Sequence, residues 1–179
     1  MTEDRLFDLL IAILPSLIVF GTAFFSIRQF LAGDQARRQT DRLVDQKRED
    51  RRHTLPLRLQ AYERLTLFLE RIAPGALVFR VHKSSMSSRM LHQALLDTIR
   101  EEFEHNVTQQ VYVSDKAWQQ VRQAKEETIR LINIAFEQTG DERSGTQLSQ
   151  QIFETASRLS HLPNQVAVIF LKDEVRKLF

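Results

Sequence analysis

The sequence contains no cysteine and has only five glycines and four prolines among 179 residues. A chain without cysteine has no disulfide framework, no thiolate zinc site and no cysteine nucleophile. The glycines stand singly, so there is no glycine-rich phosphate loop, which argues against a nucleotide-binding fold.

Neither sign of charge dominates the chain. It carries 25 Lys and Arg against 23 Asp and Glu, and residues 54–179 hold sixteen against fifteen. A nucleic-acid-binding domain usually shows a concentrated basic face, so no nucleic-acid partner is predicted. Charged residues make up 27% and the mean hydropathy is −0.30, an ordinary composition for a folded domain.

One long uncharged stretch stands apart, at residues 9–27, LLIAILPSLIVFGTAFFSI. At about 1.5 Å per residue it reaches roughly 28 Å, close to the thickness of a bilayer's hydrocarbon core. We weighed a cleaved signal peptide and a buried core helix, but the acidic N-terminus and the length of the stretch favour a single membrane-spanning helix. The sequence therefore predicts a short external segment at 1–8 and a transmembrane helix at 9–29, which makes membrane lipid an expected partner.

A charged segment follows at residues 30–53, and we interpret it as a helical juxtamembrane stalk. The excess of Lys and Arg on this side places the C-terminal part in the cytoplasm and the N-terminus outside. The expected membrane-interface residues are arginines: Arg28, Arg37, Arg38 and Arg42. They could contact anionic lipid headgroups, or the stalk could simply be a solvated continuation of the membrane helix.

Residues 54–179 show apolar residues at helical spacing in five segments, which predicts an all-α cytoplasmic bundle of about four to five helices. A helix beginning near Pro56 carries the first apolar stripe: Leu57, Ala61, Leu65, Phe68 and Ile72. Ser87 and Ser114 are predicted N-caps, and Gly140 is a predicted helix end. The short stretch VYV at 111–113 reads as extended. Residues 76–81 remain open between helix and strand, and for 165–171 we favour helix over strand.

The whole chain resembles an uncharacterised family of bacterial single-pass membrane proteins. The resemblance rests on LPLRLQAYERLTLFLERI at 55–72, IREEFEHNVTQQVYVSDKAW at 99–118 and the C-terminal FLKDEVRKLF. It implies a bacterial inner-membrane location, and it carries no activity, cofactor or catalytic residue to this chain.

One cluster has the residue types of a metal site, namely Glu101, Glu102 and His105. The spacing E-x-x-H lets one helix supply both a carboxylate and an imidazole, as in di-iron bundles. Those bundles need two such motifs and two further glutamates, whereas this chain has one motif. A solvated acidic helix face is the simpler interpretation.

Three weaker candidates complete the survey. Glu63 and Glu70 share a helix face and could be paired acid/base carboxylates. The serines near Ser87 could bind an anion, although helix capping explains them more simply. Tyr112 and Trp118 flank a break between helices and are candidate partner-docking residues.

No catalytic set and no cofactor site are predicted from these residues. The leading hypothesis is a non-enzymatic, membrane-anchored helical scaffold or interaction module that binds another protein or forms a homo-oligomer. The alternatives are a metal-binding bundle using Glu101, Glu102 and His105, and a sensor of anionic lipid surfaces.

Overall fold

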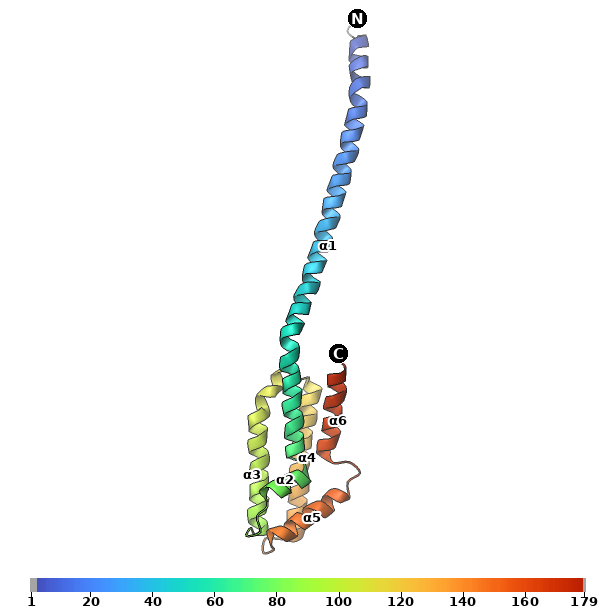
Figure 1. Cartoon of the computed structure of the whole chain (residues 1–179). Helices are drawn as coiled ribbons and strands as arrows, with labels where there is room; N and C mark the ends of the chain where they lie inside the picture. The colour runs from blue at the N-terminus through green and yellow to red at the C-terminus, as the bar shows by residue number, and fades with distance from the viewer. Residues whose placement is uncertain (1–2, 179) are drawn as a thin grey trace. The chain divides into compact units, whose positions relative to one another are not determined.

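The computed structural model describes residues 3–178 and the side chains of residues 16–29, 49 and 52–178. The chain divides into two compact units, Met1–Arg52 and His53–Phe179. Across the described residues every regular element is a helix (Figure 1), as the apolar spacing predicts.

The first unit consists of the N-terminal part of helix α1, which runs over Glu3–Arg71. Its described large apolar side chains are 58–70% exposed: Leu17, Ile18, Val19, Phe20, Phe24, Phe25 and Ile27. The rings of Phe20 and Phe24 stack one turn apart with centroids separated by 6.4 Å. The hydroxyl of Thr22 donates to the carbonyls of Ile18 and Val19, so this polar group is satisfied within the helix.

The predicted transmembrane helix at residues 9–29 is wrong. Among the described residues, no helix holds a stretch both long enough and apolar enough to cross a membrane. Residues 9–15 lie outside the part whose side chains are described. The predicted inner-membrane localisation and orientation depended on this helix and are wrong with it.

The predicted stalk at residues 30–53 falls almost entirely outside the described side chains. Arg37, Arg38 and Arg42 are among the side chains not described, whereas Arg28 is described and exposed. The prediction that a helix begins near Pro56 is wrong, because α1 includes this residue. A proline inside a helix removes one backbone hydrogen bond but leaves the others in place.

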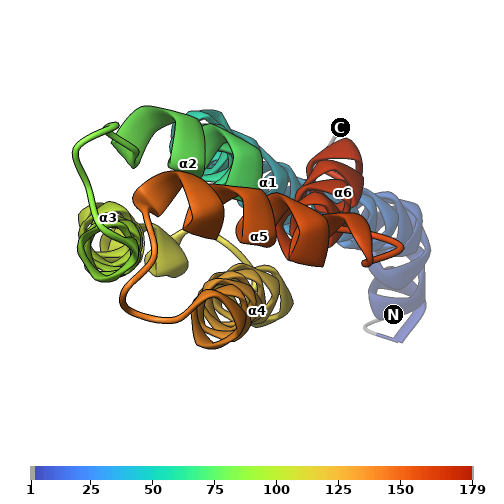
Figure 2. The same ribbon diagram turned by 90° about the horizontal axis from the view of Figure 1, so that it is seen from below.

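The second unit is a helical bundle built from α1 after residue 52 and the helices that follow it. These are α2 (Pro74–Val81), α3 (Ser88–Asn106), the 3₁₀ helix η1 (Val107–Val111), α4 (Asp115–Thr139), α5 (Gly145–Ser157) and α6 (Pro163–Arg176). α4 packs against α3, α5 and α6, and α2 packs against α3 and α5. In both ribbon views α3 and α6 lie on either side of this part of α1 (Figures 1 and 2). α4 lies behind it in Figure 1 and across the bundle from it in Figure 2.

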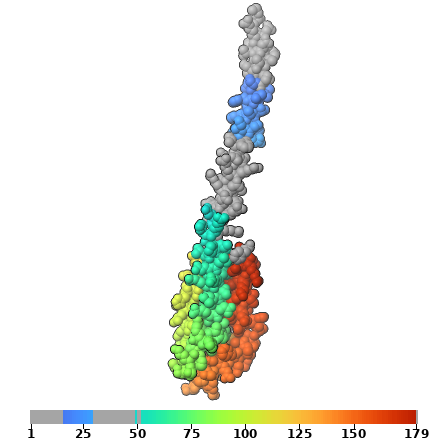
Figure 3. Space-filling model, viewed as in Figure 1, coloured from blue at the N-terminus to red at the C-terminus, as the bar shows by residue number. Residues whose placement is uncertain are grey.

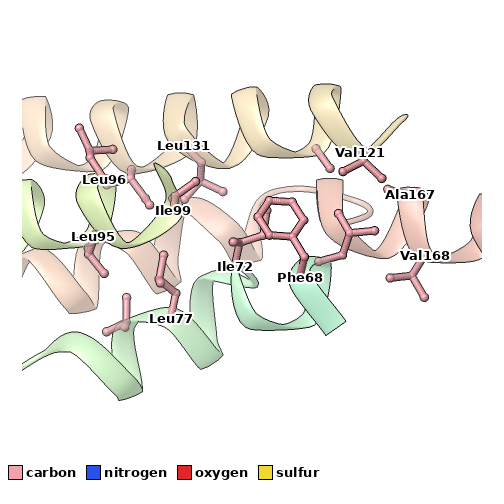
Figure 4. Close-up of a cluster of buried hydrophobic side chains, with 14 of the residues drawn as sticks. Phe68, Ile72, Leu77, Leu95, Leu96, Ile99, Val121, Leu131, Ala167 and Val168 are labelled. Carbon is pink, nitrogen blue, oxygen red and sulfur yellow. The ribbon is translucent and has the colours of Figure 1, made fainter. Parts of the chain in front are cut away.

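One continuous hydrophobic core holds the bundle together, and Figure 4 shows part of it. From α1 it takes Leu65, Phe68 and Leu69, and Ile72 follows directly after the helix; all four are at most 1% exposed. The other helices contribute residues at the predicted 3–4 spacing, including Leu91, Leu95 and Ile99 of α3 and Ala117, Val121 and Ala124 of α4. Leu57 departs from the predicted stripe and is exposed, because it lies beyond the end of the core.

The segments left open by the sequence are helical. Residues 76–81 belong to α2, which Pro74 starts from its first turn, and residues 165–171 belong to α6. The predicted extended stretch at 111–113 is wrong, since the chain forms η1 up to Val111 and then a turn. The N-caps are confirmed: the hydroxyls of Ser87 and Ser114 accept bonds from the amides of Met90 and Ala117.

Backbone hydrogen bonds join the N-terminal ends of α3 and α5. Ser87 and Ser144 form an isolated antiparallel bridge, and the amide of Gly145 donates to the carbonyl of Met86 over 2.9 Å. A Cβ at position 145 would lie 3.0 Å from that carbonyl oxygen, so only glycine fits without a shift. This joint fixes one end of the bundle.

Candidate functional site

The predicted metal cluster on α3 does not form a ligand set. Glu102 directs its carboxylate toward α1 and α2, where oxygen Oε1 meets Arg71 at 2.9 Å and Arg80 at 3.0 Å. The Nδ1 atom of His105 lies 2.6 Å from the carbonyl of Glu101, one turn back on its own helix. Across the described residues, no three His, Cys, Asp or Glu side chains are grouped so that they could hold a metal ion. The metal-binding alternative gains no support from this geometry.

The same residues instead line an open cleft of about 540 Å³ between α1 and α3. Arg64 and Arg71 border it on the α1 side, and Glu101 and Glu102 border it on the α3 side. The Glu102 side chain is 17% exposed, so its ion pairs with Arg71 and Arg80 are partly shielded from water. Oppositely charged groups therefore face each other across this cleft.

A second groove, of about 630 Å³, lies on the other side of α1, against α6. Its apolar lining comes from both helices: Leu59, Leu67, Leu171 and Val175. Glu63 and Glu70 border it on the α1 side, and Lys172 and Arg176 border it on the α6 side. Within the described side chains, Glu63, Glu70 and Lys172 form no ion pair.

Leu67 lines both the cleft and the groove, so it stands on a ridge between them. Its side chain is 56% exposed, although its neighbour Phe68 is fully buried. In the space-filling view this part of α1, teal to green, is uncovered between α3 and α6 (Figure 3). We call the exposed surface of α1 made by Gln60, Glu63, Arg64, Leu67, Glu70 and Arg71 the outer face of α1.

The charges on the outer face of α1 are sorted by side. With about 100° per residue, Glu63 and Glu70 lie about 40–60° to one side of Leu67, toward α6. Arg64 and Arg71 lie at the same angles on the other side, toward α3. Sequence reasoning noticed the seven-residue spacing of Glu63 and Glu70 but read it as acid/base chemistry. The parallel spacing of Arg64 and Arg71 was the signal that it missed.

A polar network around Tyr62, which also lines the groove, ties the start of α4 to α1 and α6. Glu174 accepts hydrogen bonds from the Tyr62 hydroxyl at 2.7 Å and from the Ser114 hydroxyl at 2.6 Å. Burial raises the pKa of Tyr62 above its usual value, and the bond to Glu174 raises it further. Every member has a structural partner here, so we assign this network to stability.

The predicted docking pair does not come together. Trp118 stacks on Phe103 with ring centroids 5.4 Å apart and packs against the core. Tyr112 is half-exposed at the end of η1, and its carbonyl accepts a bond from Arg58 at 3.2 Å. Among the described side chains no ring contact joins the two.

The serine-rich turn before α3 likewise serves the fold. Ser87 caps the helix, Ser88 is buried, and the side chain of Arg89 pairs with Asp141. Capping and packing therefore account for Ser87 and Ser88, and the anion-binding hypothesis stays a prediction.

Comparisons with known proteins agree with the resemblance in its broad form only. Searches of curated proteins and of solved structures gave no match. A family model described as a family of unknown function, DUF7935, matches residues 4–178. The match confirms an uncharacterised family but carries neither the bacterial origin nor the membrane setting that we expected. Because it covers nearly the whole chain, the protein belongs to the DUF7935 family of unknown function.

Proposed function

We propose that the bundle of residues 53–179 is a protein-interaction module, not an enzyme, and that it docks a helix on the outer face of α1. The observation that carries the proposal is Leu67, a large apolar side chain that is 56% exposed on a ridge between two hollows. A helix laid along this ridge would cover Leu67, and its flanking side chains would enter the cleft and the groove.

The charges define the partner's chemistry. Glu63 and Glu70 call for basic residues on one edge of the partner helix. Arg64, with Arg71, which is half-exposed and also pairs with Glu102, calls for acidic residues on the other edge. The proposed occupant is therefore an α-helix with an apolar stripe between one acidic and one basic edge. Complementary charges of this kind select the partner and its orientation more than they add affinity.

Site-specific photocrosslinking tests the proposal in cells that produce the full chain. A photoreactive residue in place of Leu67 should give an adduct, and peptide mapping should place it on a helix with the stated charge pattern. The matched control is position 137, an exposed glutamate on α4, which lies across the bundle from α1 (Figure 2).

The adduct at position 67 should also disappear when Glu63 and Glu70 are both changed to Lys, because the basic edge of the partner would then be repelled. No adduct at position 67, or the same adduct at positions 67 and 137, would contradict the proposal.

A further inference from the structure

We infer that the helix docked on the outer face of α1 is α1 of a second copy of this chain, lying parallel and in register around a two-fold axis that runs along the helix. This inference rests on the proposed function, since it names the partner of the same surface. It follows from the outer face itself, which has the pattern required of the partner: an apolar ridge with an acidic and a basic edge.

A two-fold interface brings one surface against itself, so the surface must complement its own rotated image. Rotation about an axis parallel to α1 exchanges the two edges. The basic edge of one copy then lies opposite the acidic edge of the other, while Leu67 meets Leu67 on the axis. Both edges gain opposite-charge contacts at once.

The other two-fold arrangement of these faces, an antiparallel pair, would place like charges opposite each other. An axis perpendicular to α1 reverses the helix direction but leaves each edge on its own side. Glu63 and Glu70 would then face the same acidic pair of the second copy, and Arg64 and Arg71 would face arginines. Like charges placed opposite each other disfavour a partner, so the antiparallel dimer is selected against.

The heights along the helix fit the parallel arrangement without any shift. Glu63 and Arg64 are neighbours in the chain, as are Glu70 and Arg71, so the members of each pair differ by only about 1.5 Å along the axis. In register, Arg64 of each copy therefore faces Glu63 of the other, and Arg71 faces Glu70. Gln60 lies one heptad before Leu67 and meets its own copy.

The flanking helices continue the pattern. α6 presents Lys172 beyond the acidic edge of α1, and α3 presents Glu101 beyond the basic edge. Rotation about the same axis brings α6 of one copy to the side of α3 of the other. Charge therefore alternates across the whole surface in the order that a parallel pair requires.

Charge exchange on the purified full chain tests this inference. The parent chain should sediment as a dimer, and Glu63→Arg or Arg64→Glu alone should raise its dissociation constant by about tenfold or more, since each creates two like-charge contacts. The double variant Glu63→Arg/Arg64→Glu should return to within about threefold of the parent. An equimolar mixture of the two single variants should form heterodimers.

The matched control is Glu137→Arg on α4, which reverses an exposed charge away from this surface and should leave dimerisation unchanged. A monomeric parent chain would overturn the inference. Single variants that dimerise normally, or a double variant no better than the singles, would do the same.

Cysteine crosslinking then shows whether the two α1 helices run parallel or antiparallel. The chain has no native cysteine, so only the introduced cysteines can form a disulfide. Leu67→Cys and Gln60→Cys should each form a disulfide with the same position in the second copy. Crosslinks only between position 60 of one copy and position 67 of the other would mean an antiparallel pair and would overturn the inference.

The two proposals fail separately. A monomeric purified chain whose position 67 captures a different protein in cells removes the self-pairing and keeps the interaction module. Loss of the cellular adduct removes the module itself.

Discussion

The two faces of α1 after residue 52 differ sharply in how far their side chains are buried. The inner face carries Leu65, Phe68 and Leu69, which are at most 1% exposed, whereas the outer face carries Leu67 at 56%. A step of one residue turns the helix by about 100°, so Leu67 and Phe68 stand in different surroundings. The comparison teaches that one helix can hold the fold together with one side while its other side stays exposed.

The largest change in the free energy of unfolding should come from a substitution on the inner face of α1. Phe68→Ala removes a buried ring that packs against Phe103 with centroids 5.9 Å apart. The cavity and the lost burial should lower the free energy of unfolding by about 3–5 kcal/mol. Chemical denaturation followed by circular dichroism measures this, and a change under about 1 kcal/mol would mean that the core is not packed as described.

A smaller effect should come from the hydrogen bond at the edge of the inner face. Tyr62→Phe removes the bond to Glu174, and the free energy of unfolding should fall by about 1–2 kcal/mol. Denaturation at pH 7 checks this value. Ser114 still bonds Glu174 in the variant, so the carboxylate keeps a partner.

The pH dependence sharpens the same prediction. Because the folded chain has a raised pKa for Tyr62, it holds this proton more tightly than the unfolded chain does. The resulting stability is complete below about pH 10 and is lost as the pH rises through the folded-state pKa. The difference between parent and Tyr62→Phe should therefore narrow above about pH 10, and a difference that grows there would contradict the assignment.

The ion pairs at the border between the two faces should matter less. Glu102→Gln removes the charge that Arg71 and Arg80 share, and the free energy of unfolding should fall by about 0.5–1 kcal/mol. The loss should shrink in high salt, because the exposed arginines are screened. Denaturation with and without added salt gives both numbers, and an effect that is independent of salt would argue against an ionic origin.

The smallest effect on the monomer should come from the outer face. Leu67→Ala should change the free energy of unfolding by no more than about 0.5 kcal/mol, because the side chain packs on little. The measurement belongs at a protein concentration where the chain is monomeric, since association adds apparent stability. A loss comparable to that of Phe68→Ala would erase the distinction between the faces.

Much of the bundle could be predicted from sequence because the signals that start and end its helices are local. The stripes on α3 and α4, the caps at Ser87 and Ser114 and the end at Gly140 depend on neighbours within one or two turns. The transmembrane helix was a failure of the same local reasoning, which read an uncharged stretch as a membrane span. The prediction of an extended stretch at 111–113 was wrong because it followed the β-propensity of three β-branched or aromatic residues. The chain needs a turn there to connect the flanking helices.

The candidate site could be predicted only in part. The seven-residue spacing of Glu63 with Glu70 and of Arg64 with Arg71 is visible in the sequence, and so is the pairing of Glu102 with His105. What the sequence could not show is that Arg71 and Arg80 would take the carboxylate of Glu102, since the three residues lie on three different helices.

By itself, the sequence determined that the chain is helical and where most helices of the bundle begin and end, because hydrogen bonding and capping within a helix are local. The apolar stripe through Leu65 already indicated which side of α1 faces the core, because helical periodicity separates position 65 from position 67. Only the tertiary structure decided that the side with Leu67 would stay uncovered, because that depends on where helices distant in the sequence pack. Packing of α3, α4 and α6 around α1 buries Leu65 and leaves Leu67 between two hollows. The charged residues on either side of Leu67 are therefore exposed together on one surface of the bundle.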